Sequence, residues 1–150
     1  MDIRPYQPAD AAALLALSTQ LISGVAPWRD PDAVREAVLG WVSDSIDRTD
    51  PDRRPIFVAE CAGRVVGFVA AGTQEHWAGS LDAYVGELVI DPHSARTGLG
   101  RRLMERAEHW AREYGYTRLT VQTGAGNAPA LAFYTALGYQ PEDVSLSKPL

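Results

Sequence analysis

The chain has 150 residues, 46% of them hydrophobic, which suits a single domain, residues 1–150, with its own core. A net charge of −5 and the lack of a basic tract argue against nucleic acid as a partner. No apolar run has the length of a membrane helix, so no membrane partner is expected. Cys61 is the only cysteine and the N-terminal segment is not typical of a secretion signal, which favours a cytoplasmic location. No histidine or cysteine spacing indicates a metal site.

The first third of the chain predicts one short strand and two helices. Residues 2–6 have the pattern of an edge strand, and leucines at helical spacing predict a helix from Asp10 to Gly24. A second helix is predicted over residues 29–46, with Asp30 as its N-cap and a proline in its first turn. One face of that helix is expected to carry Val34, Val38, Trp41 and Ser45.

The remainder of the chain alternates between strands and helices. Residues 55–73 contain two β-rich runs around an Ala-Gly turn, and residues 80–92 form a third run. A helix, a strand, a second helix and a final strand follow, over residues 99–115, 117–124, 127–139 and 144–150. This order predicts an α/β sandwich with a mixed sheet, because three successive strands can pair antiparallel before a last βαβ crossover.

A glycine-containing loop, RTGLGRRL at residues 96–103, precedes the long helix. Free N–H groups and the helix dipole make a helix start an anion site, and Gly98 and Gly100 let the backbone approach a phosphate closely. Two arginines add positive charge in the first turn. A solvated helix start with ordinary turn glycines is the alternative interpretation. A dinucleotide fingerprint requires glycine where Leu103 stands, and the chain has no Gly-Lys-Ser/Thr tripeptide of a P-loop.

Two segments, ELVIDPHSARTGLGRRLME and the later NAPALAFYTALGY, together resemble the GNAT superfamily of N-acetyltransferases. The second carries the family signature Asn-x-x-Ala-x-x-Phe-Tyr-x-x-x-Gly-Phe/Tyr from Asn127 to Tyr139. The first departs from the family at Ala95, where Arg or Gln is usual, and has Arg96 where glycine is frequent. The resemblance implies a three-layer sandwich with a mixed, mostly antiparallel sheet of about six or seven strands and helices on both faces.

By this resemblance the loop holds the pyrophosphate of acetyl-CoA, the implied co-substrate, mainly through backbone N–H groups. The thioester arm is expected along the preceding strand, with a backbone amide of Leu88, Val89 or Ile90 binding the thioester oxygen. Asn127 is expected to cap the last helix and to contact the pantetheine arm. The loop residues implied in cofactor binding are Arg96, Thr97, Gly98, Leu99, Gly100 and Arg101.

Two side chains are candidates for the chemistry of acetyl transfer. Glu87 follows Gly86, and a glycine within a strand often marks a bulge. The resemblance implies that Glu87 lies beside the reacting carbonyl as a general base, directly or through a water; a surface glutamate is the alternative. Tyr134 lies in the Phe-Tyr pair with which the family places a phenol near the CoA sulfur, and a core aromatic is the alternative. Cys61 has no histidine nearby in the sequence, which favours direct transfer in a ternary complex over an acetyl-cysteine.

The acceptor is expected to be a primary amine of a small molecule, with a protein N-terminus or lysine as the runner-up. By analogy with related folds, the segments WRDPD and EHWAGSLDAY flank the cleft, and a carboxylate there can attract a cationic amine. The tryptophans could instead cover loops or a dimer interface, so a homodimer stays open, as does a non-catalytic acyl-CoA-binding domain. The implied acceptor residues are Trp28, His76, Trp77 and Asp82.

Overall fold

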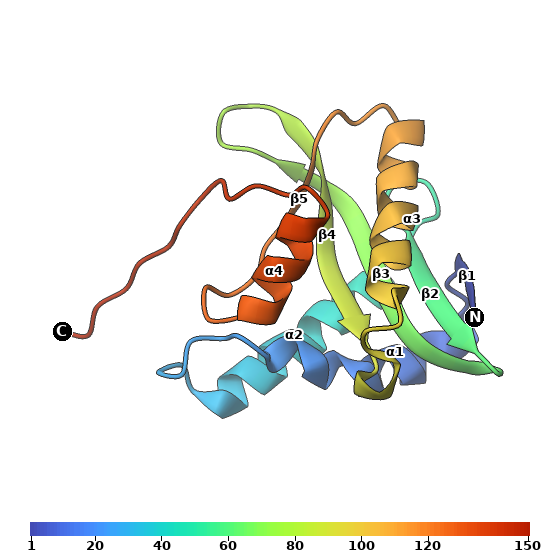
Figure 1. Ribbon diagram of the computed structural model, residues 1–150, viewed down its shortest axis with the longest axis horizontal. Coiled ribbons are helices and arrows are strands. Elements are labelled where there is room, and N and C mark those ends of the chain that lie inside the picture. Colours follow the sequence, from blue (N-terminus) through green and yellow to red (C-terminus); the bar gives the residue numbers. More distant parts are fainter.

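A single five-stranded sheet organises the computed structural model, which describes all of residues 1–150 (Figure 1). The first four strands are antiparallel to their neighbours, and the fifth pairs parallel to the fourth. The strands, in their order across the sheet, are β1 (Asp2–Pro5), β2 (Ile56–Cys61), β3 (Arg64–Glu75), β4 (Leu81–Ile90) and β5 (Leu119–Val121).

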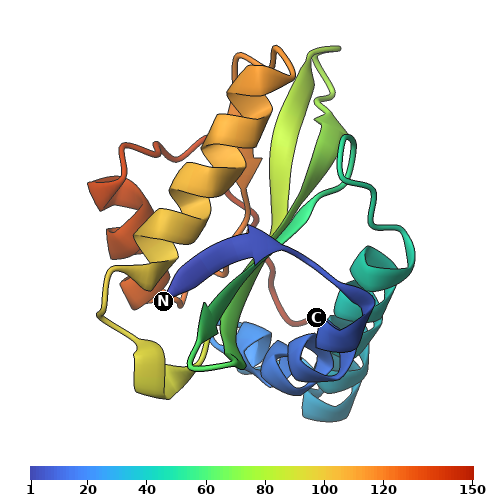
Figure 2. The same ribbon diagram turned by 90° about the vertical axis from the view of Figure 1, so that its right-hand side faces the viewer.

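Helices cover both faces of the sheet, as Figure 2 shows, so the expected three-layer sandwich is confirmed. One face carries α1 (Ala11–Leu17) and α2 (Pro31–Asp47), and the other carries α3 (Leu99–Glu113) and α4 (Ala128–Ala136). Short 3-10 helices complete the elements: η1 (Pro8–Asp10), η2 (Ser18–Ile22) and η3 (Pro92–Ser94). No helix is long and apolar enough to cross a membrane.

The sheet separates two hydrophobic cores, and β3 contributes to both by alternation. Val69 and Ala71 belong to the larger core, with the buried stripe of α3, whereas Phe68 and Ala70 belong to the smaller core with α1 and α2. Because both faces are covered, β3 is a continuous apolar run through its middle rather than an alternating one.

Local signals set the ends of the helices as the sequence predicts. The Asp30 carboxylate accepts a hydrogen bond from the amide of Ala33 at 3.1 Å, so Asp30 caps α2. Gly115 (φ +81°) follows the C-cap of α3, and Gly138 (φ +94°) follows that of α4. Both glycines adopt the left-handed conformation that side chains disfavour, which ends each helix at that place.

Three predictions about the elements are wrong. The helix expected from Asp10 to Gly24 is regular only in α1 and continues as the 3-10 helix η2. On α2 the second buried position is Val42, while Trp41 is 57% exposed. The strand expected over residues 144–150 is absent: residues 140–150, here called the C-terminal tail, are exposed and extended, so the sheet has five strands instead of six or seven. A strand without a pairing partner forms no ladder.

Candidate active site

A β-bulge in β4 opens the sheet beside β5. Glu87 lies opposite Ala70 and Val85 opposite Ala71, so Gly86 is an extra residue without a partner on β3. β5 pairs only with residues 83–85 of β4, and beyond the bulge β4 has no neighbour on that side. The predicted bulge at Gly86 is therefore confirmed, and it leaves an opening between the two strands.

Two backbone amides of β4 face this opening. The amide of Asp91 donates to the carbonyl of Val66 on the β3 side at 2.8 Å. Successive amides of a strand point to alternate sides, so those of Ile90 and Leu88 point away from β3, toward the opening. The amide of Val89 points to β3, so of the three residues expected to bind the thioester oxygen, Leu88 and Ile90 are the two with a free N–H there.

Glu87 is a buried carboxylate on the α2 face of the sheet, with 5% of its surface exposed. Ser45 of α2 donates its hydroxyl to this carboxylate, at 3.1 Å from Oε1 and 3.0 Å from Oε2. Burial raises the pKa of Glu87 to about 7, a rise that the Ser45 hydrogen bond reduces and the charge of Asp44 increases. A carboxylate tuned to neutral pH has the protonation behaviour of a general base, and the interpretation of Glu87 as a surface residue is wrong.

The sequence predicts Ser45 on one face of the second helix but does not assign it to the site. Its position in the sequence could have indicated the role, because Ser45 follows Val38 and Val42 at helical spacing. Its hydroxyl therefore lies on the stripe of α2 that faces the sheet. A polar group at such a position needs a partner, and Glu87 is that partner.

Tyr134 lies on the other side of the opening, in α4. Burial raises the pKa of its phenol to about 12, and its hydroxyl makes no hydrogen bond within the protein. Its ring packs edge-on against Phe133 (5.1 Å between centroids) and Tyr139 (5.8 Å). The Tyr139 hydroxyl donates to Glu108 of α3 at 3.0 Å. Tyr134 lines the central cavity, whereas Phe133 packs toward α3, so their predicted division between cleft and core agrees with the structure.

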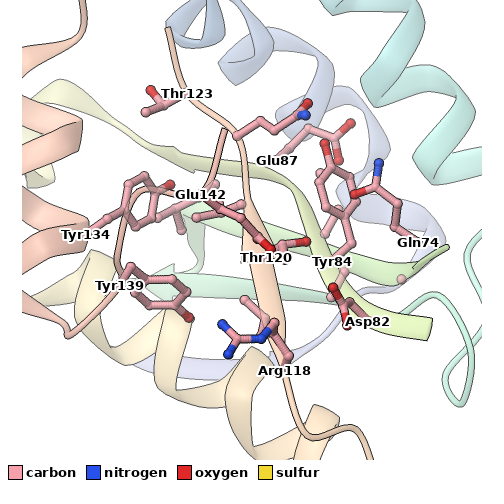
Figure 3. Close-up of a pocket in the computed structure, with 18 of the residues that line it drawn as sticks. Gln74, Asp82, Tyr84, Glu87, Arg118, Thr120, Thr123, Tyr134, Tyr139 and Glu142 are labelled. Atoms are coloured by element: carbon pink, nitrogen blue, oxygen red, sulfur yellow. The ribbon is translucent and has the colours of Figure 1, made fainter. Parts of the chain in front are cut away.

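Figure 3 shows Tyr134 and Tyr139 on one side of the chain segment that carries Arg118 and Thr120, with Tyr84 and Glu87 on the other. All of these residues line one cavity of about 1690 Å³. Small-molecule sites usually occupy ~300–1,000 Å³, so this cavity has room for two substrates.

The loop before α3 has the donors that a phosphate group needs. The backbone amides of residues 97–101 have no hydrogen-bond partner, and the next amide, of Arg102, donates to the carbonyl of Gly98 at 3.2 Å. Gly98 is left-handed (φ +80°), with open space where a Cβ would project. Arg96 is also left-handed (φ +62°), a conformation that suits the glycine frequent at this position in the family. These orphaned donors fit the pyrophosphate of acetyl-CoA.

The packing of two helices requires glycine at position 100, whereas the sequence suggested close approach of the backbone to a phosphate. A Cβ at Gly100 would lie 3.2 Å from the ring of Phe133, so this glycine lets α3 pack against α4. Close approach to a phosphate is therefore not the only constraint on Gly100. Arg101 and Thr97 are both exposed at the same helix start, and Leu99 is buried in the larger core.

Asn127 caps α4 as predicted and also joins two loops. Its side-chain oxygen accepts from the amide of Ala130 at 3.2 Å, and its Nδ2 donates to the carbonyl of Ser23 at 3.3 Å. A Cβ at Gly24 would overlap the Asn127 side chain, so glycine permits this close approach. Both ends of the amide already have partners, and a contact with the pantetheine arm would require one of them to be exchanged.

The expected acceptor residues separate into two groups. His76, Trp77 and Asp82 line the same cavity as Glu87 and Tyr134, although Trp77 is 87% exposed. Trp28 is exposed and does not line it. Cys61 lies at the end of β2, also outside the cavity lining, and so is not placed to carry an acetyl group.

The fold, the bulged strand and the free amides before α3 together resemble an acetyltransferase α/β sandwich. The model of the Acetyltransferase (GNAT) family matches residues 19–139, so the chain belongs to that family. A curated relative, the dTDP-fucosamine acetyltransferase of Escherichia coli, is 30% identical over 120 residues, which are 80% of this chain and 49% of the relative. The chain thus spans about half the length, or less, of the first curated relatives that it matches.

Solved structures share the fold at low sequence identity. The aminoglycoside 6′-N-acetyltransferase of Acinetobacter haemolyticus is 20% identical, with a TM-score of 0.74 over 100% of this chain and 99% of that one. The aminoglycoside acetyltransferase AAC(6′)-Iy, solved with the bisubstrate analogue CoA-S-monomethyl-acetylneamine, is 19% identical, with a TM-score of 0.73 over 99% and 97% of the two chains.

Proposed function

We propose that this protein is an acetyl-CoA-dependent N-acetyltransferase that acetylates a primary amine of a small molecule by direct attack in a ternary complex. The observation that carries this proposal is Glu87, a buried carboxylate with a pKa raised to about 7 beside the opening of a bulged strand. The phenol of Tyr134, which has no partner, lines the same cavity. Family membership supports the same reaction.

The binding mode of acetyl-CoA follows from the free backbone donors. The amides of residues 97–101 hold the pyrophosphate at the start of α3, where the helix dipole also favours an anion. The opening between β4 and β5 takes the pantetheine arm, and the amide of Leu88 or Ile90 donates to the thioester oxygen. Bound there, acetyl-CoA supplies the activated acetyl group. The neighbour AAC(6′)-Iy was solved with a CoA-based bisubstrate analogue, which supports a CoA thioester as a ligand for this fold.

Glu87 takes the proton that the amine must lose. A free alkylammonium has a pKa near ~10.4 and a carboxylic acid near ~4.3, so an ordinary carboxylate is too weak a base. The raised pKa of Glu87 reduces this mismatch while leaving about half of the side chains ionised at pH 7. In the transfer the new N–C bond forms, the C–S bond breaks, and the amine proton passes to Glu87, directly or through one water.

Tyr134 stabilises the departing sulfur as a hydrogen-bond donor. A thiol has a pKa near ~8.5, so complete transfer of a proton from a phenol with a pKa of about 12 is uphill by roughly 5 kcal/mol. For an ordinary phenol, with a pKa near ~10, the same step would be only slightly uphill. A phenol that stays protonated and donates to the thiolate fits the structure better than one that gives up its proton.

A thiol-detecting assay of CoA release with a panel of amines tests this function. We expect CoA release that depends on a small primary amine and that falls strongly in Glu87→Gln. Release with lysine peptides but not with small amines would favour the runner-up acceptor. Binding of acetyl-CoA without release with any amine would favour the non-catalytic alternative.

We further propose that the protein forms a homodimer. The C-terminal tail exposes the alternating side chains Val144 (79%) and Leu146 (90%), followed by Leu150. The outer edge of β5 has no neighbour within the chain. The first residues of the tail line the central cavity, and Figure 1 shows its end extending away from the body. An exposed alternating segment and a free strand edge are complementary, since each supplies the hydrogen-bonding groups that the other lacks.

A further inference from the structure

Asp82, one of the expected acceptor residues, lies in a largely buried position and has no part in the proton transfer described above. Only 6% of its surface is exposed, yet its carboxylate forms neither a hydrogen bond nor an ion pair within the protein. Neither of its oxygens is fully enclosed, so the carboxylate keeps an accessible side on which it can bind a cation. Asp82 lines the central cavity, and Figure 3 shows it on β4 among the residues around that cavity.

Asp82 and Glu87 point to the same face of β4. Ala83 and Val85 belong to the larger core on the opposite face, whereas Val89 belongs to the smaller core beside α2. Because Gly86 is the extra residue of the bulge, Asp82, Tyr84 and Glu87 follow one another on the α2 side, as Figure 3 shows. Asp82 and Glu87 lie opposite Gln74 and Ala70, which are four residues apart on β3. Four strand steps of ~3.3 Å therefore place Asp82 about 13 Å from Glu87 along β4.

The cavity between these two carboxylates favours positive charge. Seven acidic and three arginine side chains line it. Arg118, whose guanidinium points away from Asp82 in Figure 3, forms no ion pair with it. Thr120, which lies opposite Tyr84 on β5, adds a hydroxyl on the same side. A cation in this cavity is attracted by the excess of carboxylates, among which Asp82 has no partner within the protein.

We propose that Asp82 binds a second cationic group of the acceptor, so that the enzyme selects amines with another ammonium about 13 Å from the reacting nitrogen. The proposal rests on the proposed function, since it takes Glu87 as the position of the reacting amine. Asp82 then acts as a specificity-determining residue that orients the acceptor and takes no part in proton transfer. Linear diamines and polyamino sugars both offer this chemistry.

Comparing 1,10-diaminodecane with decylamine tests the proposal, because the two differ only in the second ammonium. In the parent protein we expect a kcat/KM at least about tenfold higher for the diamine. Asp82→Asn keeps the shape of the side chain and removes its charge, so KM for the diamine should rise about tenfold or more while kcat and the decylamine reaction stay within about twofold. Glu75→Gln removes an equal charge from an exposed position of the same cavity and should change KM for the diamine by less than about threefold. Kanamycin as a third substrate tells whether a sugar scaffold positions the charges better than a linear chain does.

Calorimetric titration of the diamine into the parent and Asp82→Asn proteins provides a readout that needs no turnover. Weaker binding of the diamine by Asp82→Asn than by the parent protein supports Asp82 as the site of a cationic group. Absence of acetylation with every amine would separately refute the proposed function. Equal binding of the diamine by both proteins, or an equal loss for diamine and decylamine in Asp82→Asn, overturns the role of Asp82 and leaves the proposed function untouched. Thermal denaturation of each variant confirms that it is folded.

Discussion

Glu87 is held in surroundings that oppose its charge, and this has a consequence for stability as well as for catalysis. Its pKa is about 7 in the folded protein and near 4.5 when exposed, so folding favours the protonated form. Below pH 4.5 both states are protonated and no cost arises. As the pH rises through 7 the ionised form is destabilised in the fold by on the order of 3 kcal/mol.

We therefore predict that Glu87→Gln raises the free energy of unfolding at pH 8 by on the order of 1 to 3 kcal/mol and leaves it nearly unchanged near pH 4.5. Glutamine is neutral, keeps the shape of the side chain and retains an oxygen for the Ser45 hydroxyl. Chemical denaturation at the two pH values measures the effect. A variant that is no more stable than the parent at pH 8 contradicts a raised pKa at Glu87.

Tyr134 offers a substitution that separates packing from chemistry. Tyr134→Phe keeps the ring between Phe133 and Tyr139 and removes a hydroxyl that has no partner in the protein. We predict that turnover falls by roughly 10²- to 10³-fold, the scale of losing one positioned acid or donor, while acetyl-CoA affinity changes little. Steady-state kinetics and calorimetry measure the two quantities. A folded variant with the parental rate would make Tyr134 a core aromatic only.

Glu87 and Tyr134 could be singled out from the sequence because each stands next to a recognisable feature, the strand glycine Gly86 and the Phe-Tyr pair. Ser45 could not be assigned to Glu87 in the same way, because 42 residues separate them and only the packing of α2 on β4 brings them together. The buried, unpaired state of Asp82 likewise depends on three-dimensional surroundings that no local pattern encodes.

At the level of the elements, α3 offers a matched pair of glycines, one at each end. Gly98 and Gly115 have nearly the same left-handed φ, +80° and +81°, and an added Cβ meets no atom within 4 Å at either. We predict that Gly98→Ala and Gly115→Ala each cost about 1 kcal/mol of stability. Only Gly98→Ala should also weaken CoA binding, by about tenfold, because Gly98 belongs to the loop of free amides at residues 97–101 whereas Gly115 lies at the far end of α3.

Calorimetry with CoA on both variants checks this expectation, with thermal denaturation to match their stabilities. Equal CoA affinities in the two variants would remove the loop as the pyrophosphate site. Gly98 is a better probe than Gly100, where a larger side chain also disturbs the contact with Phe133.

The elements that local signals define were predictable, and those that depend on distant partners were not. The apolar stripe and terminal glycine of α3, and the β2–β3 hairpin, agree with the structure. The helix expected from Asp10 loses its regular form at Ser18, whose hydroxyl donates to the carbonyl of Leu15 at 2.7 Å, a local bond that competes with helical geometry. The tail has the alternation of a strand, but it does not pair with the free outer edge of β5 and so forms no ladder.

For the whole molecule, the exposed tail leads to a prediction about assembly. We expect a dimer at micromolar concentration that is weakened at least about tenfold by the double substitution Val144→Ser with Leu146→Ser, since these changes remove two apolar side chains from the proposed contact. Sedimentation velocity over a range of concentrations measures it. The exposed Leu39→Ser on α2 serves as a control for lost surface hydrophobicity. A monomeric parent protein contradicts the homodimer.

The most direct test of the central claim, that Glu87 is the base of an acetyl transfer, is the pH dependence of kcat/KM for the best amine in the parent, Ser45→Ala and Glu87→Gln proteins. We predict an acidic limb with a midpoint near pH 7 in the parent, because Glu87 must be ionised to accept the proton. Loss of the Ser45 hydrogen bond, which lowers the pKa of Glu87, should move that midpoint to higher pH. In Glu87→Gln the rate should fall by about 10²-fold and the limb should vanish. A limb that stays near pH 7 in all three proteins would contradict the account and assign the proton to another group.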